Sequence, residues 1–227
     1  MVNERTITFV KSVIENRLKK VATIIADTAK NKTHQGNAEN NAKKDPRSKT
    51  YDATYDALRA AGAACKQNLS ENNIKILTLA VYGWMPTVLD IAKEYGGQQI
   101  KMESVKSAIQ FAKNWKQSGS NNIERAMEQF EILARFIDNS YVGASKFLHF
   151  LFPDSFAIFD SNIAEVLNEL SKDLTNEKQR PIFSKNANKP ANFILYELAM
   201  RKAVEIMRKD GDASLRKVER VLFYAFR

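Results

Sequence analysis

Residues 141–162 are the most distinctive stretch of the chain, and they read YVGASKFLHFLFPDSFAIFDSN. Gly143 is a turn residue, and the apolar run that follows it predicts a buried helix from about residue 145 to residue 152. Pro153 ends this helix, because proline has no amide N–H and disfavours helix in the residue before it.

A short extended run over residues 156–159 then leads to Asp160 at the start of the next helix. Lys146 lies near the start of the buried helix. The packed core is therefore expected to hold two ionisable groups in place, Lys146 and Asp160, and the functional hypothesis depends on whether they meet.

The rest of the chain predicts an all-α protein with eight to ten helices. Apolar residues recur at helical spacing through most of it, and the clearest stripe runs from Ile123 to Ile137. Two further helices are expected over residues 191–209 and 213–226. No pair of strands joined by a hairpin turn is apparent.

Two polar stretches, residues 31–50 and 172–190, contain few large apolar side chains and are expected to be loops. The chain is predicted to form a single helical unit over residues 1–227, or two lobes. In the second arrangement, one lobe comprises residues 51–140, and the other combines residues 1–30 with 141–227.

Charge points to a polyanionic partner. The 227 residues contain 35 Lys and Arg against 26 Asp and Glu, a net charge of +9. Such an excess attracts nucleic acid, so DNA is the expected partner.

Other classes of protein are excluded by the sequence. No apolar run is long enough to cross a bilayer, and the N-terminus has no signal-peptide pattern, so we expect a cytoplasmic protein, at the nucleoid if it binds DNA. A single cysteine, Cys65, rules out an iron–sulfur cluster, and two histidines rule out a histidine-rich metal site. Phosphate-loop and dinucleotide fingerprints are absent, and no metal or cofactor is expected.

Lys146 and Asp160 suggest one particular chemistry. A lysine amine becomes a nucleophile when burial lowers its pKa, and it can then attack a carbon such as C1′ of a deoxyribose. An aspartate at a helix start can orient that amine or stabilise positive charge that develops on the sugar.

The order of these features over residues 137–166 resembles the helix-hairpin-helix DNA glycosylase superfamily, in its 8-oxoguanine glycosylase and endonuclease III branches. The shared order is a helix, a Val-Gly turn, a buried helix led by Lys, a Pro break, a short apolar run and an Asp. The resemblance implies that Val142 and Gly143 form a hairpin that grips DNA, with Ser145 beside it. It also implies that Lys146 attacks the sugar and that Asp160 assists.

We therefore expect a base-excision protein, with or without lyase activity, that acts on modified or damaged bases. Candidates for phosphate contacts on the last helix are Arg216, Lys217 and Arg220, and candidates for stacking on an extruded base are Trp84, Trp115 and Phe159. The alternative is a non-enzymatic all-α module that binds nucleic acid or protein. In that case Lys146 is a surface lysine, and Asp160 or Ser161 only caps a helix.

Overall fold

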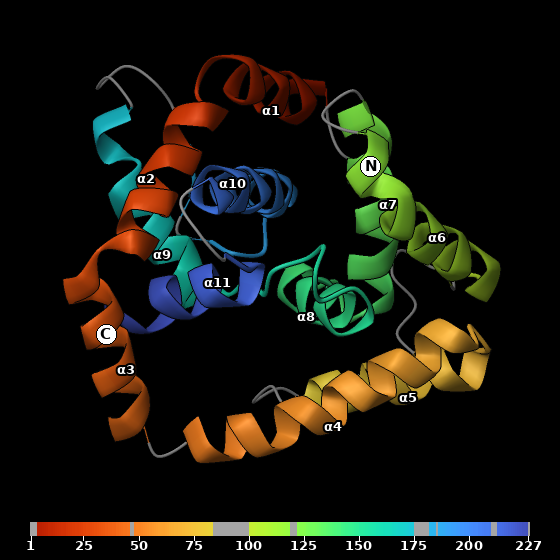
Figure 1. Ribbon diagram of the computed structural model, residues 1–227. Helices are drawn as coiled ribbons and strands as arrows, with labels where there is room; N and C mark the ends of the chain where they lie inside the picture. The colour runs from red at the N-terminus through yellow and green to blue at the C-terminus, as the bar shows by residue number, and fades with distance from the viewer. Residues whose placement is uncertain are drawn as a thin grey trace.

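The computed structural model describes residues 4–45, 48–83, 100–118, 122–174, 182–184, 186–209 and 213–226. These residues form eleven α-helices, one 3₁₀-helix and no strand (Figure 1). The predicted all-α class is confirmed, with eleven helices in place of the expected eight to ten. The α-helices are α1 (Glu4–Asn16), α2 (Leu18–Lys30), α3 (Lys32–Lys44), α4 (Ser48–Gln67), α5 (Glu71–Gly83), α6 (Met102–Ser118), α7 (Ile123–Phe136), α8 (Tyr141–Leu151), α9 (Ser161–Leu170), α10 (Pro190–Arg208) and α11 (Leu215–Tyr224), and the 3₁₀-helix η2 is Lys172–Leu174.

Helix α10 is the centre of the fold. It packs against α1, α2, α7, α8 and α11, and Figure 1 shows it nearly end-on with these helices around it. Pro190 occupies its first turn, where the missing N–H removes no helical hydrogen bond. Its side chains are buried on more than one face, which is typical of a helix enclosed by others.

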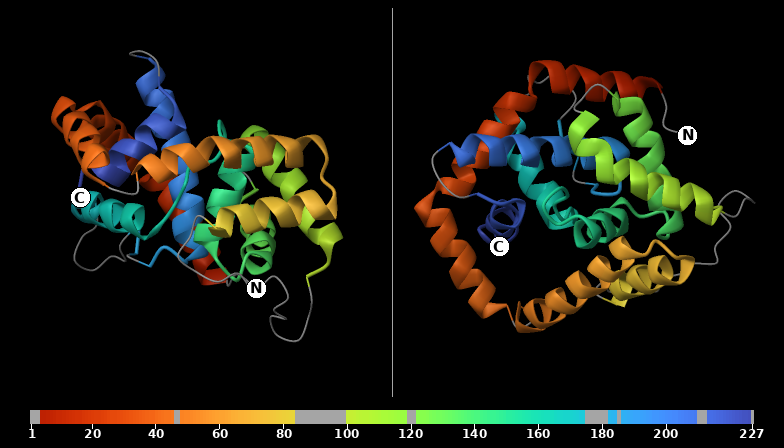
Figure 2. Two further views of the ribbon diagram at one scale, coloured as in Figure 1. Left: turned by 90° about the horizontal axis from the view of Figure 1, so that it is seen from below. Right: turned by 45° about the vertical axis from the view of Figure 1, so that its right-hand side comes forward.

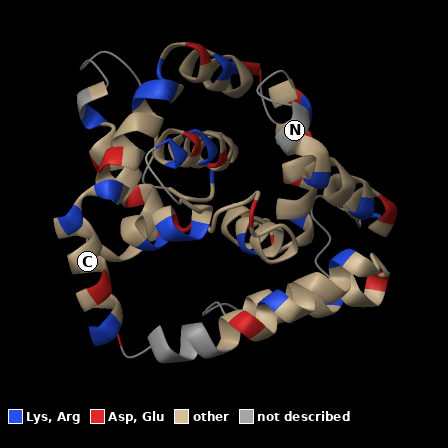
Figure 3. Cartoon of the chain, in the orientation of Figure 1, with Lys and Arg blue, Asp and Glu red and all other residues tan. Residues whose placement is uncertain are grey.

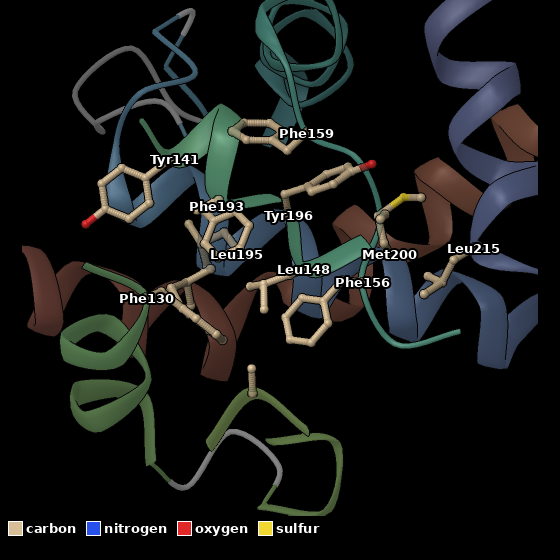
Figure 4. Packing of buried hydrophobic residues seen from close by; sticks show 14 of the residues in the cluster. Phe130, Tyr141, Leu148, Phe156, Phe159, Phe193, Leu195, Tyr196, Met200 and Leu215 are labelled. Carbon is tan, nitrogen blue, oxygen red and sulfur yellow. The ribbon is translucent and has the colours of Figure 1, made fainter. Parts of the chain in front are cut away.

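Aromatic side chains fill the core around α10. Phe130 of α7 contacts the rings of Phe156 and Phe193 edge-on, with ring centroids 5.8 and 5.2 Å away. Phe159 stacks on Tyr196 with centroids 4.8 Å apart, and Figure 4 shows these two rings side by side. Because Phe156 and Phe159 belong to the run after Pro153, this run lies inside the core.

Helices α4 and α5 lie side by side, and both pack against α8 (Figure 2). The crossing of α4 and α8 is very close at Gly62. A Cβ atom at this position would lie 2.0 Å from the backbone oxygen of Phe150. Glycine therefore allows the two helix backbones to approach here.

The expected loop over residues 31–50 is wrong, because residues 32–44 form α3 and α4 already begins at Ser48. Asn31 caps α3, and its side chain accepts hydrogen bonds from the amides of Thr33 and His34. The helix packs against α11 through two small residues, Ala38 and Ala42, both buried. A helix with such a narrow apolar face gives little hydrophobic periodicity, so the pattern indicated a loop.

The expected loop over residues 172–190 is correct only in part. Residues 182–184 and 186–189 form no helix, whereas residues 172–174 form η2 and α10 already begins at Pro190. The division of the chain into one unit or two lobes stays a prediction. In the part of the chain that the structure describes, no helix has the length and hydropathy needed to cross a membrane.

Candidate functional site

The run from Phe156 to Asp160 is an extended segment buried among helices, and side chains hydrogen-bond its backbone. Its amides donate to three side chains on separate helices. The bonds run from Ala157 N to Glu197 Oε2 (3.2 Å), from Ile158 N to Glu219 Oε2 (3.1 Å) and from Phe159 N to Ser145 Oγ (3.1 Å). These three side chains provide the hydrogen-bond acceptors that the carbonyls of a neighbouring β-strand would otherwise supply.

The carbonyls of the segment are bonded in the same way. Nδ1 of His149 lies 2.8 Å from the carbonyl oxygen of Phe156, and the Tyr196 hydroxyl donates to Ile158 O at 2.8 Å. The hydroxyl of Ser145 lies 3.0 Å from Phe159 O and 2.8 Å from Val142 O. Because it has a single hydrogen, it donates to one of these two carbonyls at a time. The segment is therefore fixed to α8, α10 and α11 at once.

Helix α8 starts earlier than expected, at Tyr141 and not near residue 145. Ser140 caps it by accepting a hydrogen bond from the amide of Gly143. The turn before it contains Asp138 and Asn139, both with positive φ. Val142 and Gly143 therefore lie in the first turn of α8, just after this turn, and their expected part in gripping DNA stays a prediction.

Gly143 has a packing role in this first turn. A Cβ atom there would lie 2.6 Å from Cγ2 of Ile137, so a larger residue would force the two apart. Ser145, the third candidate in this region, is fully buried and bonded to the extended segment. Its hydroxyl is therefore occupied within the fold.

The structure brings Lys146 and Asp160 into one neighbourhood. Each is the chain neighbour of a residue in the Ser145–Phe159 hydrogen bond, which joins α8 to the segment before α9. Asp160 caps α9, since its Oδ1 accepts a hydrogen bond from the amide of Ile163 at 3.0 Å. Burial lowers the pKa of Lys146 below its ordinary value, and the negative charges of Asp160 and Glu219 oppose this lowering.

Glu219 of α11 is a second carboxylate whose charge acts on Lys146, and it is almost completely buried. Its Oε1 forms an ion pair with the guanidinium of Arg216, and its Oε2 accepts the amide of Ile158. Burial raises the pKa of Glu219, while the charge of Arg216 and the Ile158 N–H oppose that rise. Burial alone would lower the pKa of Arg216, but Glu219 holds it above the ordinary value.

The polar cluster continues from Arg216 to α4 and back to α8. The Arg216 guanidinium lies over the ring of Tyr55, 4.6 Å from its centroid, and the Tyr55 hydroxyl is 2.6 Å from Nε2 of His149. Since Nδ1 of His149 faces a carbonyl, it carries the hydrogen, and Nε2 accepts from Tyr55. Burial lowers the pKa of His149 to about 4, so its imidazole is neutral at pH 7.

We call the six side chains of this region the α8–α11 polar cluster. They are Tyr55, Lys146, His149, Asp160, Arg216 and Glu219.

The three candidates for phosphate contacts lie on α11 but differ in exposure. Lys217 and Arg220 are exposed, whereas Arg216 is partly buried in its ion pair with Glu219. Figure 3 shows Lys and Arg on helices all around the molecule. Lys217 and Arg220 are therefore the two of the three that are open to a polyanion.

Two of the stacking candidates are enclosed by the core. Trp115 is 1% exposed, and the guanidinium of Arg201 covers its ring at 4.2 Å from the centroid. Phe159 is fully buried against Tyr196. Neither ring can stack on a base in this arrangement, and Trp84 lies outside the described residues.

Sequence reasoning missed four members of the site, namely Tyr55, His149, Glu197 and Glu219. A signal for Glu219 is present, because it lies on the apolar face of α11 with Leu215 and Leu222. Glu197 similarly falls among apolar residues of α10. A carboxylate on an apolar helix face implies a buried hydrogen-bond partner.

Among the described residues, no three His, Cys, Asp or Glu side chains are grouped so that they could hold a metal ion. Comparison of the chain with protein families, with curated proteins and with solved structures finds no match. The functional argument therefore depends on the residues of the site.

Proposed function

We propose that the protein is a base-excision enzyme that acts on modified or damaged DNA, with Lys146 as nucleophile and Asp160 as its assistant. The observation that carries the proposal is the position of Lys146, which is half-buried on α8 next to Ser145, whose bond to Phe159 brings Asp160 into the same region. Burial lowers the pKa of Lys146 there, and the charge of Asp160 acts on it. An amine that loses its proton more readily is a better nucleophile near pH 7.

In the proposed step, the lone pair of Lys146 Nζ forms a bond to C1′ of the deoxyribose. The bond from C1′ to the base breaks, and the base leaves with its electron pair and takes up a proton. Opening of the sugar ring then gives an imine between Nζ and C1′, with the former ring oxygen as a hydroxyl. Asp160 would stabilise the positive charge that develops on the sugar.

The net charge of +9 agrees with a DNA substrate, and the exposed Lys217 and Arg220 are the proposed phosphate contacts. The base would have to be extruded from the duplex to expose C1′ to Lys146. Because Trp115 and Phe159 are buried, the proposal assigns neither of them to stacking on that base.

Trapping with borohydride tests the proposal, because borohydride reduces the imine to a stable covalent adduct. The wild-type protein is incubated with duplexes that carry an abasic site or an oxidised, alkylated or deaminated base. We expect an adduct with at least one duplex, and Lys146→Ala is expected to abolish it.

A matched control is Lys202→Ala, since Lys202 is an exposed lysine of α10 paired with Glu205. This variant should form the adduct like the wild type. Undiminished trapping in a folded Lys146→Ala variant would remove Lys146 from the mechanism. Absence of an adduct with every duplex of the panel would argue against the covalent mechanism.

A second candidate function is a non-enzymatic module that binds DNA through the same basic surface. The capping of α9 by Asp160 favours it, because this bond is a sufficient structural reason for an aspartate at that position. The two functions differ in DNA selectivity. A steep loss of affinity with salt and equal affinity for modified and unmodified duplexes would support the binding module.

A further inference from the structure

Among the described residues, three large apolar side chains are exposed, and only Phe226 of these three is aromatic. It follows the end of α11 and is 44% exposed, whereas the other two, Ile76 and Leu79, are aliphatic side chains of α5. A flat exposed ring can stack on another flat group, which a branched aliphatic side chain cannot do. Phe226 is therefore the open aromatic ring that the buried Trp115 and Phe159 do not provide.

The ring of Phe226 is held in place by α3. It stacks on His34, with the ring centroids 5.0 Å apart and the planes inclined by 29°. Just before it in the chain, the carbonyl oxygen of Tyr224 accepts a hydrogen bond of 2.9 Å from the side-chain amide of Asn41. Alanine side chains of α3 pack against the same end of α11. Because these contacts fix the ring, a flat partner that stacks on it has little side-chain ordering to induce.

The two helices that hold this ring are basic at their surface. Their exposed charged side chains are five basic ones and one acidic one, namely Lys32, Lys43, Lys44, Lys217 and Arg220 against Glu39. The remaining charges of α11, Arg216 and Glu219, form an ion pair. A partner that matches this surface carries negative charge together with a flat face. Unpaired nucleotides have both, since each has a phosphate and a base that can stack on an aromatic side chain.

We propose that α3 and α11 form a binding surface for single-stranded DNA, in which an unpaired base stacks on Phe226 and neighbouring phosphates contact Arg220 and Lys217. The inference rests on the proposed function for the identity of DNA as the partner, and it goes beyond that function by assigning where unpaired bases bind. Arg220 precedes Phe226 by six residues, which is about 9 Å at the rise of a helix. Two to three stacked nucleotides cover about this distance, so one short strand spans both side chains.

The test measures binding of a labelled oligothymidine of about ten nucleotides to the full-length protein by fluorescence anisotropy. Phe226→Ala should weaken binding by about 5- to 150-fold, the range expected for the loss of one stacked base. Phe226→Tyr keeps the ring and should bind like the wild type. Leu79→Ala is the matched control, because it removes an apolar side chain of similar exposure (54%) from α5 and should leave the affinity unchanged.

The salt dependence of binding separates stacking from charge. Phe226→Ala should keep the salt dependence of the wild type, because it removes no phosphate contact. Lys217→Ala and Arg220→Ala should each reduce the slope of log K against log salt by about 0.7, the value for one phosphate contact on a single strand. A fully paired duplex offers no unpaired base, so the wild type and Phe226→Ala should bind it equally.

Equal affinity of Phe226→Ala and the wild type for the single strand would overturn the proposal. A loss of the same size with the duplex, or no binding of the single strand by the wild type, would overturn it as well. Phe226→Trp gives a second readout, since stacking of a base should quench the fluorescence of the added indole. No more quenching than in the wild type would also count against the proposal.

These binding measurements need no reaction of the DNA, so they are independent of the excision step. Weakened binding in Phe226→Ala, without a borohydride adduct on any duplex, would refute the proposed function and leave the binding surface standing. An adduct together with unchanged affinity in Phe226→Ala would do the reverse.

Discussion

Gly62 is buried in the interior of α4, at the place where this helix crosses α8. Replacement by alanine would normally stabilise a helix interior by about 1 kcal/mol. Here the added Cβ would lie 2.0 Å from Phe150 O and 2.6 Å from the carbonyl carbon. An ordinary contact begins at 3.4 Å, so the two backbones would have to separate by 1.4 Å (3.4 − 2.0).

Both atoms belong to backbone, so no side-chain rotation relieves the overlap. Overpacking of this kind costs about 1–3 kcal/mol. Because this overlap is with backbone, the cost should lie at the upper end of that range, and the helix gain of about 1 kcal/mol offsets part of it. We therefore expect Gly62→Ala to lower the free energy of unfolding by about 2 kcal/mol, measured by urea denaturation. The separation should also break the bond of 2.6 Å between Tyr55 of α4 and His149 of α8, which an NMR titration of His149 would detect.

Gly36→Ala is the matched control. Gly36 also lies inside a helix, α3, but a Cβ there would meet nothing within 4 Å. This variant should be more stable than the wild type by about 0.5–1 kcal/mol. The reasoning would be refuted if Gly62→Ala were as stable as the wild type, because the close approach of α4 and α8 would then be absent.

Three further predictions concern the buried polar groups. Ser145→Ala removes the hydrogen-bond partner of Phe159 N and should lower the free energy of unfolding, measured in urea, by about 1–3 kcal/mol. A loss of less than about 0.5 kcal/mol would contradict the role of Ser145 in holding the segment. Burial lowers the pKa of His149 to about 4 in the folded protein, against 6.5 in the unfolded chain, so the unfolded chain binds the proton at a higher pH. The free energy of unfolding should therefore fall by up to about 3 kcal/mol as the pH drops from 6.5 to 4. His149→Gln should flatten this acidic decline in urea titrations at several pH values, and an unchanged slope would assign the decline to other groups. Burial raises the pKa of Glu197 to about 8 in the folded protein, against 4.5 in the unfolded chain, so the folded protein keeps the proton to a higher pH. The free energy of unfolding should therefore fall by up to about 5 kcal/mol as the pH rises from 4.5 to 8. Thermal melts of Glu197→Gln should lose this dependence, and a decline as steep as that of the wild type would show that Glu197 is ionised in the folded state.

Local sequence patterns determined the helical class of this protein. The apolar stripe from Ile123 to Ile137 predicted α7, and Pro153 marked the end of the buried helix α8. The start of α9 at Asp160 was also predicted, because a short acidic side chain can cap a helix through bonds within a few residues. These features depend on neighbours in the sequence and could be recognised there.

The same patterns failed at α3 and at the start of α8. Helix α3 is stabilised by packing of Ala38 and Ala42 against α11, which is remote in the sequence. Gly143 indicated a turn, but it lies inside α8, where its missing side chain makes room for Ile137. A glycine that permits close packing and a glycine that forms a turn look the same in a sequence.

Only the tertiary structure decided which groups surround Lys146. The sequence placed Lys146 and Asp160 at defined points of two helices, and the bond between Ser145 and Phe159 brings those points together. Glu219 and His149 join them through hydrogen bonds to residues 158 and 156, respectively. Hydrophobic periodicity is a local property that selects the buried face of each helix. The partner of a buried polar group is set by how the helices cross, because a hydrogen bond requires contact in space and leaves no spacing in the sequence.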